Sequence, residues 1–121
     1  MATFPGGPQV LGTAQTGNVN TAIGQYVSAS DAVRTPAIVI TSTVGATPTV
    51  TADIRGSVDG ANWHNVPYSL VGTLNTYAVG AITITTATTT LYQLQGGQAW
   101  QYVRVEFTSN LNVSLTTTLY A

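Results

Sequence analysis

The 121-residue sequence contains no cysteine, no lysine and few charged residues of any kind. Without cysteine, neither a disulfide framework nor a thiolate metal site can form. Charged residues make up 6% of the chain, against about 25% in an average soluble domain. Three arginines cannot build the basic groove that phosphate contacts require, so we expect no nucleic-acid partner. A surface this poor in charge favours permanent assembly over the alternative, a secreted or cell-surface module.

Long apolar runs are also missing. A membrane-spanning helix needs about 20 mainly apolar residues, whereas the longest obvious run is centred on residues 38–40. The first residues, MATFPGGPQ, show neither the basic nor the apolar region of a signal peptide. We therefore expect no membrane partner, and a product that stays in the compartment where it is made.

Short β-strands are the element that recurs along the chain. Apolar or small residues alternate with polar ones over residues 50–58, which is the period of a half-buried strand. Residues 103–107 and 111–119 alternate in the same way, with a break at Thr117. We interpret residues 45–48 and Asn110 as turns between strands. About seven to nine such strands, without an amphipathic helix, predict an all-β fold: a single antiparallel β-sandwich or small barrel, jelly-roll or Ig-like.

The inward-facing positions of these strands form the predicted core. It consists of Ile38, Ile40, Val50, Ile54, Val58, Trp63, Val103, Val105, Phe107, Val113 and Leu115.

The first 30 residues are rich in proline and glycine, which argues against a helix. We predict an extended N-terminal arm over residues 1–22 and a β-sandwich domain over residues 23–121. Phe4, Val10 and Leu11 are the arm residues expected to contact a neighbouring molecule. A frayed terminus is the alternative, but it would leave these three apolar side chains in water.

Residues that carry chemistry are scarce. His64 is the single histidine, and a metal site would need further ligands. Asp53 and Asp59 would lie about 20 Å apart on an extended strand, too far for glycoside hydrolysis. Arg104 and Glu106 are neighbours on one strand face and are expected to form an ion pair, as are Asp53 and Arg55, within or across strands. We therefore expect no catalytic residue, no cofactor and no metal, and a protein that is not an enzyme.

A tight turn follows the strand over residues 50–58. Asp59 can accept hydrogen bonds from the backbone that follows it, and Gly60 allows a positive φ. Asn62 helps to form the turn, and Trp63 begins the return strand. The spacing of residues 59–62 is similar to a calcium loop, but the acidic residues that complete such a loop are missing.

Four aromatic residues, Trp63, Tyr68, Trp100 and Tyr102, would form a platform for a sugar if the fold brought them together. Carbohydrate or cell-surface binding is therefore the alternative function. The competing interpretation is that both tryptophans fill or seal the core.

The hairpin sequence GSVDGANW at residues 56–63, followed by Val66 and Pro67, resembles the G-S-x-D-G-x-N-W hairpin of many small β-rich structural proteins of tailed bacteriophages. Similar sequence motifs occur in discoidin-like and other extracellular β-sandwich modules, but the paired cysteines common in those modules are absent here. With its scarce charge and abundant threonine, alanine and glycine, the chain is most similar to capsid decoration, or cement, proteins. That resemblance implies a virion protein, made in the host cytoplasm, that binds the major capsid protein and itself on the outer capsid surface, as a trimer. A head-tail or tail component would have a similar sequence.

Overall fold

The computed structural model describes residues 8–25, 36–73, 76–94 and 100–120. Nine β-strands account for most of these residues, and one short 3-10 helix, η2 (Val71–Thr73), lies between two of them. The strands pair in antiparallel fashion in one open sheet, so the predicted all-β antiparallel fold is confirmed and the sheet is not a closed barrel. The strands are β1 (Pro8–Gln15), β2 (Val19–Asn20), β3 (Gly24–Gln25), β4 (Ala37–Ser57), β5 (His64–Asn65), β6 (Tyr68–Leu70), β7 (Ile82–Ile84), β8 (Thr88–Leu94) and β9 (Tyr102–Tyr120).

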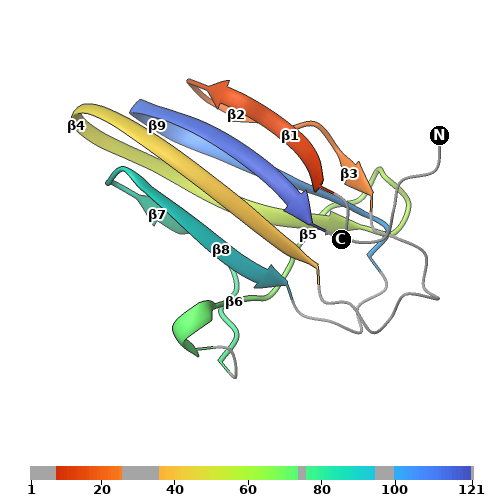
Figure 1. Ribbon diagram of the computed structural model, residues 1–121. Coiled ribbons are helices and arrows are strands. Elements are labelled where there is room, and N and C mark those ends of the chain that lie inside the picture. The colour runs from red at the N-terminus through yellow and green to blue at the C-terminus, as the bar shows by residue number, and fades with distance from the viewer. Residues whose placement is uncertain (1–7, 26–35, 74–75, 95–99, 121) are drawn as a thin grey trace.

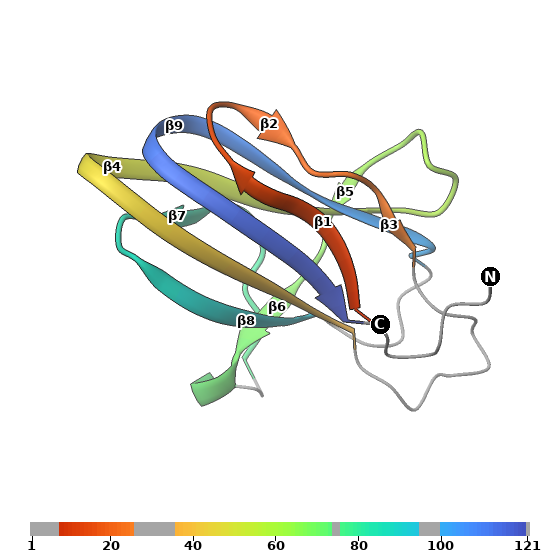
Figure 2. The same cartoon turned by 45° about the horizontal axis from the view of Figure 1, so that its top comes forward.

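Two long strands organise this sheet. β4 has 21 residues and β9 has 19, and they pair from Ala37 with Tyr120 to Ser57 with Tyr102. Both strands turn back on themselves near their middle, at the same end of the molecule as the β1–β2 and β7–β8 connections (Figures 1 and 2). The sheet is therefore folded across its middle into two facing layers.

Each layer contains one half of both long strands. The first layer consists of β1, the C-terminal half of β9, the N-terminal half of β4, β8 and β6. The second layer consists of β2, β3, the N-terminal half of β9, the C-terminal half of β4, β5 and β7. The two layers enclose the core, which gives the sandwich that the alternation predicted.

The crease between the layers is made by β-bulges and left-handed residues. The β4–β9 register shifts between Val44 and Thr49 and again between Thr49 and Thr51. Thr47, Ser109 and Asn112 have φ angles of 48°, 52° and 56°. A bulge with a left-handed residue bends a strand without ending it. The predicted turns at residues 45–48 and at Asn110 are therefore wrong as strand ends: they are bends inside continuous strands.

The core is formed by alternate residues of the facing layers. Most of the predicted core residues are buried, but Val58 is 56% exposed and Trp63 is only half-buried. Val58 lies just beyond Ser57, the last paired residue of β4. Thr117, where the alternation broke, lies in the core itself and is fully buried. The buried hydrophobic residues are Leu11, Ile38, Ile40, Val50, Ala52, Ile54, Val66, Ile82, Ile84, Tyr92, Leu94, Val103, Val105, Phe107, Val113, Leu115 and Leu119.

Residues 8–22, which the sequence analysis assigned to an arm, belong to the sheet. β1 pairs with the end of β9, and Leu11 is 4% exposed within the core. The N–H of Ala22 donates to the Leu11 carbonyl (2.9 Å), which joins the edges of the two layers. Bulges in β1 on either side of Gly12 interrupt the alternation and so conceal the strand in the sequence. Val10 is 63% exposed, and Phe4 lies outside the described residues.

Replacing Leu11 with alanine tests whether β1 is part of the folding unit. We expect Leu11→Ala to lower the free energy of unfolding by about 2 to 5 kcal/mol, because it leaves a cavity between the layers. Val10→Ala, on the exposed side of the same strand, is the matched control and should change it by less than about 0.5 kcal/mol. Urea denaturation measures both, and equal small effects would contradict the placement of β1.

Replacing Thr47 with glycine tests the crease. A left-handed conformation costs an L-residue about 1 to 2 kcal/mol, and glycine's added flexibility in the unfolded chain costs about 0.5 to 1 kcal/mol. Thr47→Gly should therefore stabilise the protein by about 0.5 to 1 kcal/mol. Thr43→Gly, in the extended part of the same strand, should destabilise it by a similar amount. Thermal denaturation of both variants gives the comparison, and a loss of stability in Thr47→Gly would be evidence against the bend.

Candidate functional site

The charged residues of the described strands lie together on one side of the molecule. Asp53 and Arg55 on β4 and Arg104 and Glu106 on β9 alternate with buried residues, so their side chains occupy the outer face of the second layer. Asp59, the other described charged residue, lies in the turn that follows β4. Charged residues that are far apart in the sequence therefore lie together on one face of the fold.

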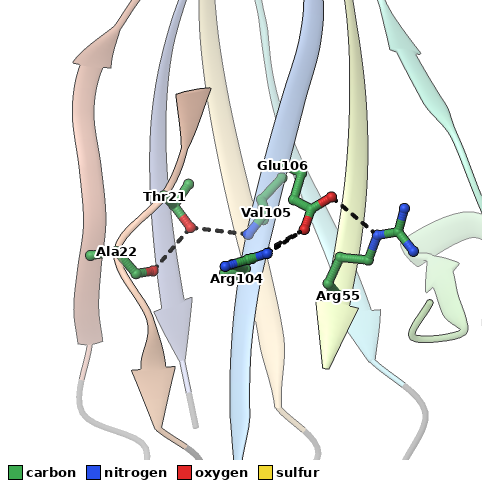
Figure 3. Close-up of polar contacts among 6 residues, drawn as sticks. All are labelled: Thr21, Ala22, Arg55, Arg104, Val105 and Glu106. Carbon is green, nitrogen blue, oxygen red and sulfur yellow. Dashed lines mark hydrogen bonds and ion pairs between the residues drawn. The ribbon is translucent and has the colours of Figure 1, made fainter. Parts of the chain in front are cut away.

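Glu106 is the centre of an ion-pair network on this face. Its Oε2 accepts hydrogen bonds from Nε (3.1 Å) and Nη2 (2.8 Å) of Arg104, and its Oε1 lies 3.3 Å from Nε of Arg55 (Figure 3). The Arg104 guanidinium also lies over the Trp63 ring, 4.3 Å from its centroid. The expected Arg104–Glu106 pair is therefore present, while Arg55 pairs across strands with the same glutamate. Because two guanidiniums occupy this carboxylate, it is poorly suited to act as a general base.

On the edge of β9 that faces away from β4, a buried threonine, Thr21, bonds to the backbone of Val105 (Figure 3). The Thr21 hydroxyl accepts from the Val105 N–H (3.0 Å) and donates to the Ala22 carbonyl (3.0 Å), while the Thr21 N–H donates to the Val105 carbonyl (2.9 Å). Thr21 is 4% exposed. Its hydroxyl takes the place of a backbone partner between β2 and β3, which makes its role structural.

The turn at residues 59–62 is held by Asp59. Its Oδ1 accepts from the N–H groups of Ala61 (2.8 Å) and Asn62 (2.9 Å) and from the Ser57 hydroxyl (3.0 Å), and its Oδ2 accepts from Nδ2 of Asn62 (2.7 Å). Gly60 has a φ of 80°. These hydrogen bonds, those from the Asn62 and Ala61 backbone first, hold the pKa of Asp59 well below its usual 3.8. The carboxylate is committed to forming the turn.

The four aromatic residues do not form one platform. Trp100 packs over Gly56, where an added Cβ would lie 2.8 Å from its ring, and stacks with His64 at a centroid distance of 5.8 Å. Tyr68 belongs to the first layer and packs edge-on against Tyr92. Trp63 lies under Arg104 of the second layer, and Tyr102, the first residue of β9 in the same layer, lies beside Gly60 of the turn. The structure therefore brings His64 to Trp100 and separates Tyr68 from Trp63.

Within residues 8–25, 36–73, 76–94 and 100–120, no three histidine, aspartate or glutamate side chains are grouped closely enough to hold a metal ion. No helix in this part of the chain is long and apolar enough to cross a membrane.

A hollow of about 410 Å³ lies along the crease. Asn110 and Asn112 line it, together with residues 43–45 and 113–114. Both amides already bind backbone: Asn110 contacts Gly17 and Val113, and Nδ2 of Asn112 donates to the Ala46 carbonyl (2.7 Å). These asparagines stabilise the bend, so their amides are committed to the backbone.

Among the residues that the structure describes, none on the outer face of the first layer is charged. Its side chains alternate with the buried residues of four neighbouring strands, and Val10, Leu91 and Tyr120 are 63%, 37% and 43% exposed. Threonine predominates, and the hydroxyls of Thr41 and Thr89 hydrogen-bond across strands (3.1 Å). We call this surface the uncharged face; it comprises Pro8, Val10, Ala37, Val39, Thr41, Thr43, Thr89, Leu91, Gln93, Ser114, Thr116, Thr118 and Tyr120. The composition shows that charged residues are scarce, but not which face of the fold lacks them.

The Asp59 turn makes a pH-dependent contribution to stability. Because the folded pKa is lowered, that contribution is complete above the unfolded value of 3.8 and is lost as the pH falls through the folded pKa. Thermal melts between pH 7 and pH 2 should show a steeper loss for the wild type than for Asp59→Asn. Asp53→Asn, which alters no hydrogen bond of the turn, should follow the wild type. Parallel curves for the wild type and Asp59→Asn would exclude this role.

Comparisons with known proteins identify a similar fold. No protein-family model matches the chain, and no curated protein matches its sequence. The structure is similar to the crystal structure of the SPBc2 prophage-derived protein YomS, with a TM-score of 0.62 over 99% of this chain and 96% of that chain. The two sequences are 8% identical, so the likeness shows a shared fold.

Proposed function

We propose that this protein is a structural component of a tailed-bacteriophage virion, and that it acts by protein–protein contacts as a capsid decoration protein. The observation that carries the proposal is the uncharged face of the first layer. Threonine hydroxyls and methyls can be buried against another protein at a smaller desolvation cost than lysine or glutamate side chains. The similarity in fold to a prophage-derived protein, over nearly the whole of both chains, supports a phage origin.

In this proposal the charged face is directed away from the shell. Its two arginines are balanced by Glu106, which both contact, and by Asp53 on the same face, and Arg104 lies over the Trp63 ring. The face therefore adds little net charge to the outer surface. The binding partners are the major capsid protein and further copies of this chain. No catalytic step, cofactor or metal is involved.

Carbohydrate binding is less favoured by the arrangement of the aromatic residues. A sugar-binding platform needs exposed ring faces that lie side by side. Here one face of Trp63 is covered by Arg104, Trp100 packs over Gly56, and Tyr68 lies in the other layer. A head-tail or tail position uses the same kind of contact surface and is separated from head decoration by experiment.

Immunogold electron microscopy of virions from the phage that encodes this chain tests the proposal. Antibodies against the purified protein should label the head surface of intact particles at many sites. The tube of the tail and the neck serve as internal controls on the same particles. Label confined to the tail would replace the decoration role with a tail role. Virions without label, confirmed by mass spectrometry of the particles, would overturn the structural assignment.

A further inference from the structure

Part of the outer edge of β8 has no strand paired with it. β8 pairs with β4 from Thr88 to Gln93 without any shift in register. On its other side, β6 pairs with it from Tyr92 to Leu94, and η2, which follows β6, also contacts it. Among the described strands, none pairs with the outer side of β8 at residues 88–91. This part of the strand has the sequence TTTL, which contains β-forming residues and neither proline nor charge.

The direction of the backbone groups along β8 follows from its bonds to β4. The Leu94 N–H donates to the Pro36 carbonyl (2.9 Å), and the Thr88 N–H donates to Oγ of Ser42 (3.1 Å). Because backbone groups alternate in direction along a strand, those of Thr89 and Leu91 point away from β4. Their N–H and C=O groups therefore lie along the open edge.

The other edges of the sheet are protected in ways that this one is not. β1 is bulged, and its neighbour β3 is bonded through the Gln9 side chain, which binds both the N–H and the C=O of Gln25 (2.9 and 2.7 Å). The far side of Tyr68 on β6 is bonded to Ala78 in both directions. β5 and β7 have two and three residues. Short, bulged or covered edges resist pairing with other chains, and a flat uncharged one invites it.

We propose that residues 88–91 of β8 form a self-association edge, at which two copies of this chain pair in antiparallel fashion around Thr90. Thr89 of each copy exchanges backbone hydrogen bonds with Leu91 of the other. The pairing joins two first layers into one continuous sheet and makes their uncharged faces a single, wider surface. With no charged residue on the edge, self-pairing sets no like charges opposite each other. This inference rests on the proposed function and specifies one contact between copies of the chain.

The contact is two-fold and small. An isologous contact of this kind gives dimers or other even assemblies, in contrast with the trimer that the resemblance to cement proteins implies. A strand edge of four residues buries far less than the roughly 1,200 Å² of a stable interface. Such a contact is weak in solution, but copies held side by side on a shell have an effective concentration of about 1 mM.

Sedimentation velocity over about 10 μM to 1 mM tests the edge. The wild type should shift from monomer to dimer as its concentration rises. Leu91→Pro removes an N–H that points outward, a position at which an edge strand tolerates proline, and should remain monomeric with an unchanged far-UV spectrum. Leu91→Thr keeps the N–H and is the matched control; it should associate like the wild type.

A charge pair gives a second, independent test of the register. Leu91→Lys alone should prevent association, because an edge lysine blocks strand pairing. Combining it with Thr89→Glu should restore association in a salt-sensitive way, since residues 89 and 91 of opposite copies face each other. If Leu91→Pro fails to fold, the comparison of Leu91→Lys with the double variant still tests the edge contact and its register.

Three results would overturn the inference: a wild type that is monomeric at 1 mM, a trimer that Leu91→Pro leaves intact, or single variants that associate like the wild type. The immunogold result is independent of these. Head labelling with a monomeric wild type removes the edge contact alone, and dimers without any virion label remove the proposed function alone.

Discussion

The antiparallel pairing of β4 with β9 is the constraint on which the rest of this structure depends. Each strand passes through both layers, so each covers the core from two sides and fixes where the other strands attach. The pairing continues across the crease because Thr47, Ser109 and Asn112 adopt left-handed conformations there. The backbone strain at these three residues is offset by the β4–β9 hydrogen-bond ladder, which continues on both sides of the bend.

One consequence of this arrangement is that the two outer faces become chemically different. A single strand contributes its first half to one layer and its second half to the other, so the position of a residue along β4 decides which face it joins. Asp53 and Arg55 lie beyond the bend, whereas Val39 and Thr41 lie before it. The charged residues of the described strands are thus collected on the second layer, and an extended surface suited to protein contacts is left on the first.

The sequence predicted most of the buried residues but misassigned the ends of the chain's elements. Period-two alternation located Ile54, Val105 and Phe107 in the core, because their burial follows from the local pattern alone. It missed Leu11, since the bulges in β1 break the alternation, and it placed Val58 inside although β4 ends just before it. The aromatic residues are a further example, because nothing in the local sequence indicates that Tyr68 and Trp63 belong to different layers.

By itself, the sequence determined the fold class, the alternation of each strand and the chemistry of the Asp59 turn, because these depend on residues close together in the chain. The tertiary structure decided whether a glycine- or asparagine-containing segment ends a strand or bends it. That choice depends on whether a partner strand continues to pair beyond the segment, and at residues 45–48 and 109–112 it does. It also decided which face receives the charge and which edge is left open, since both follow from pairings between residues far apart in the sequence.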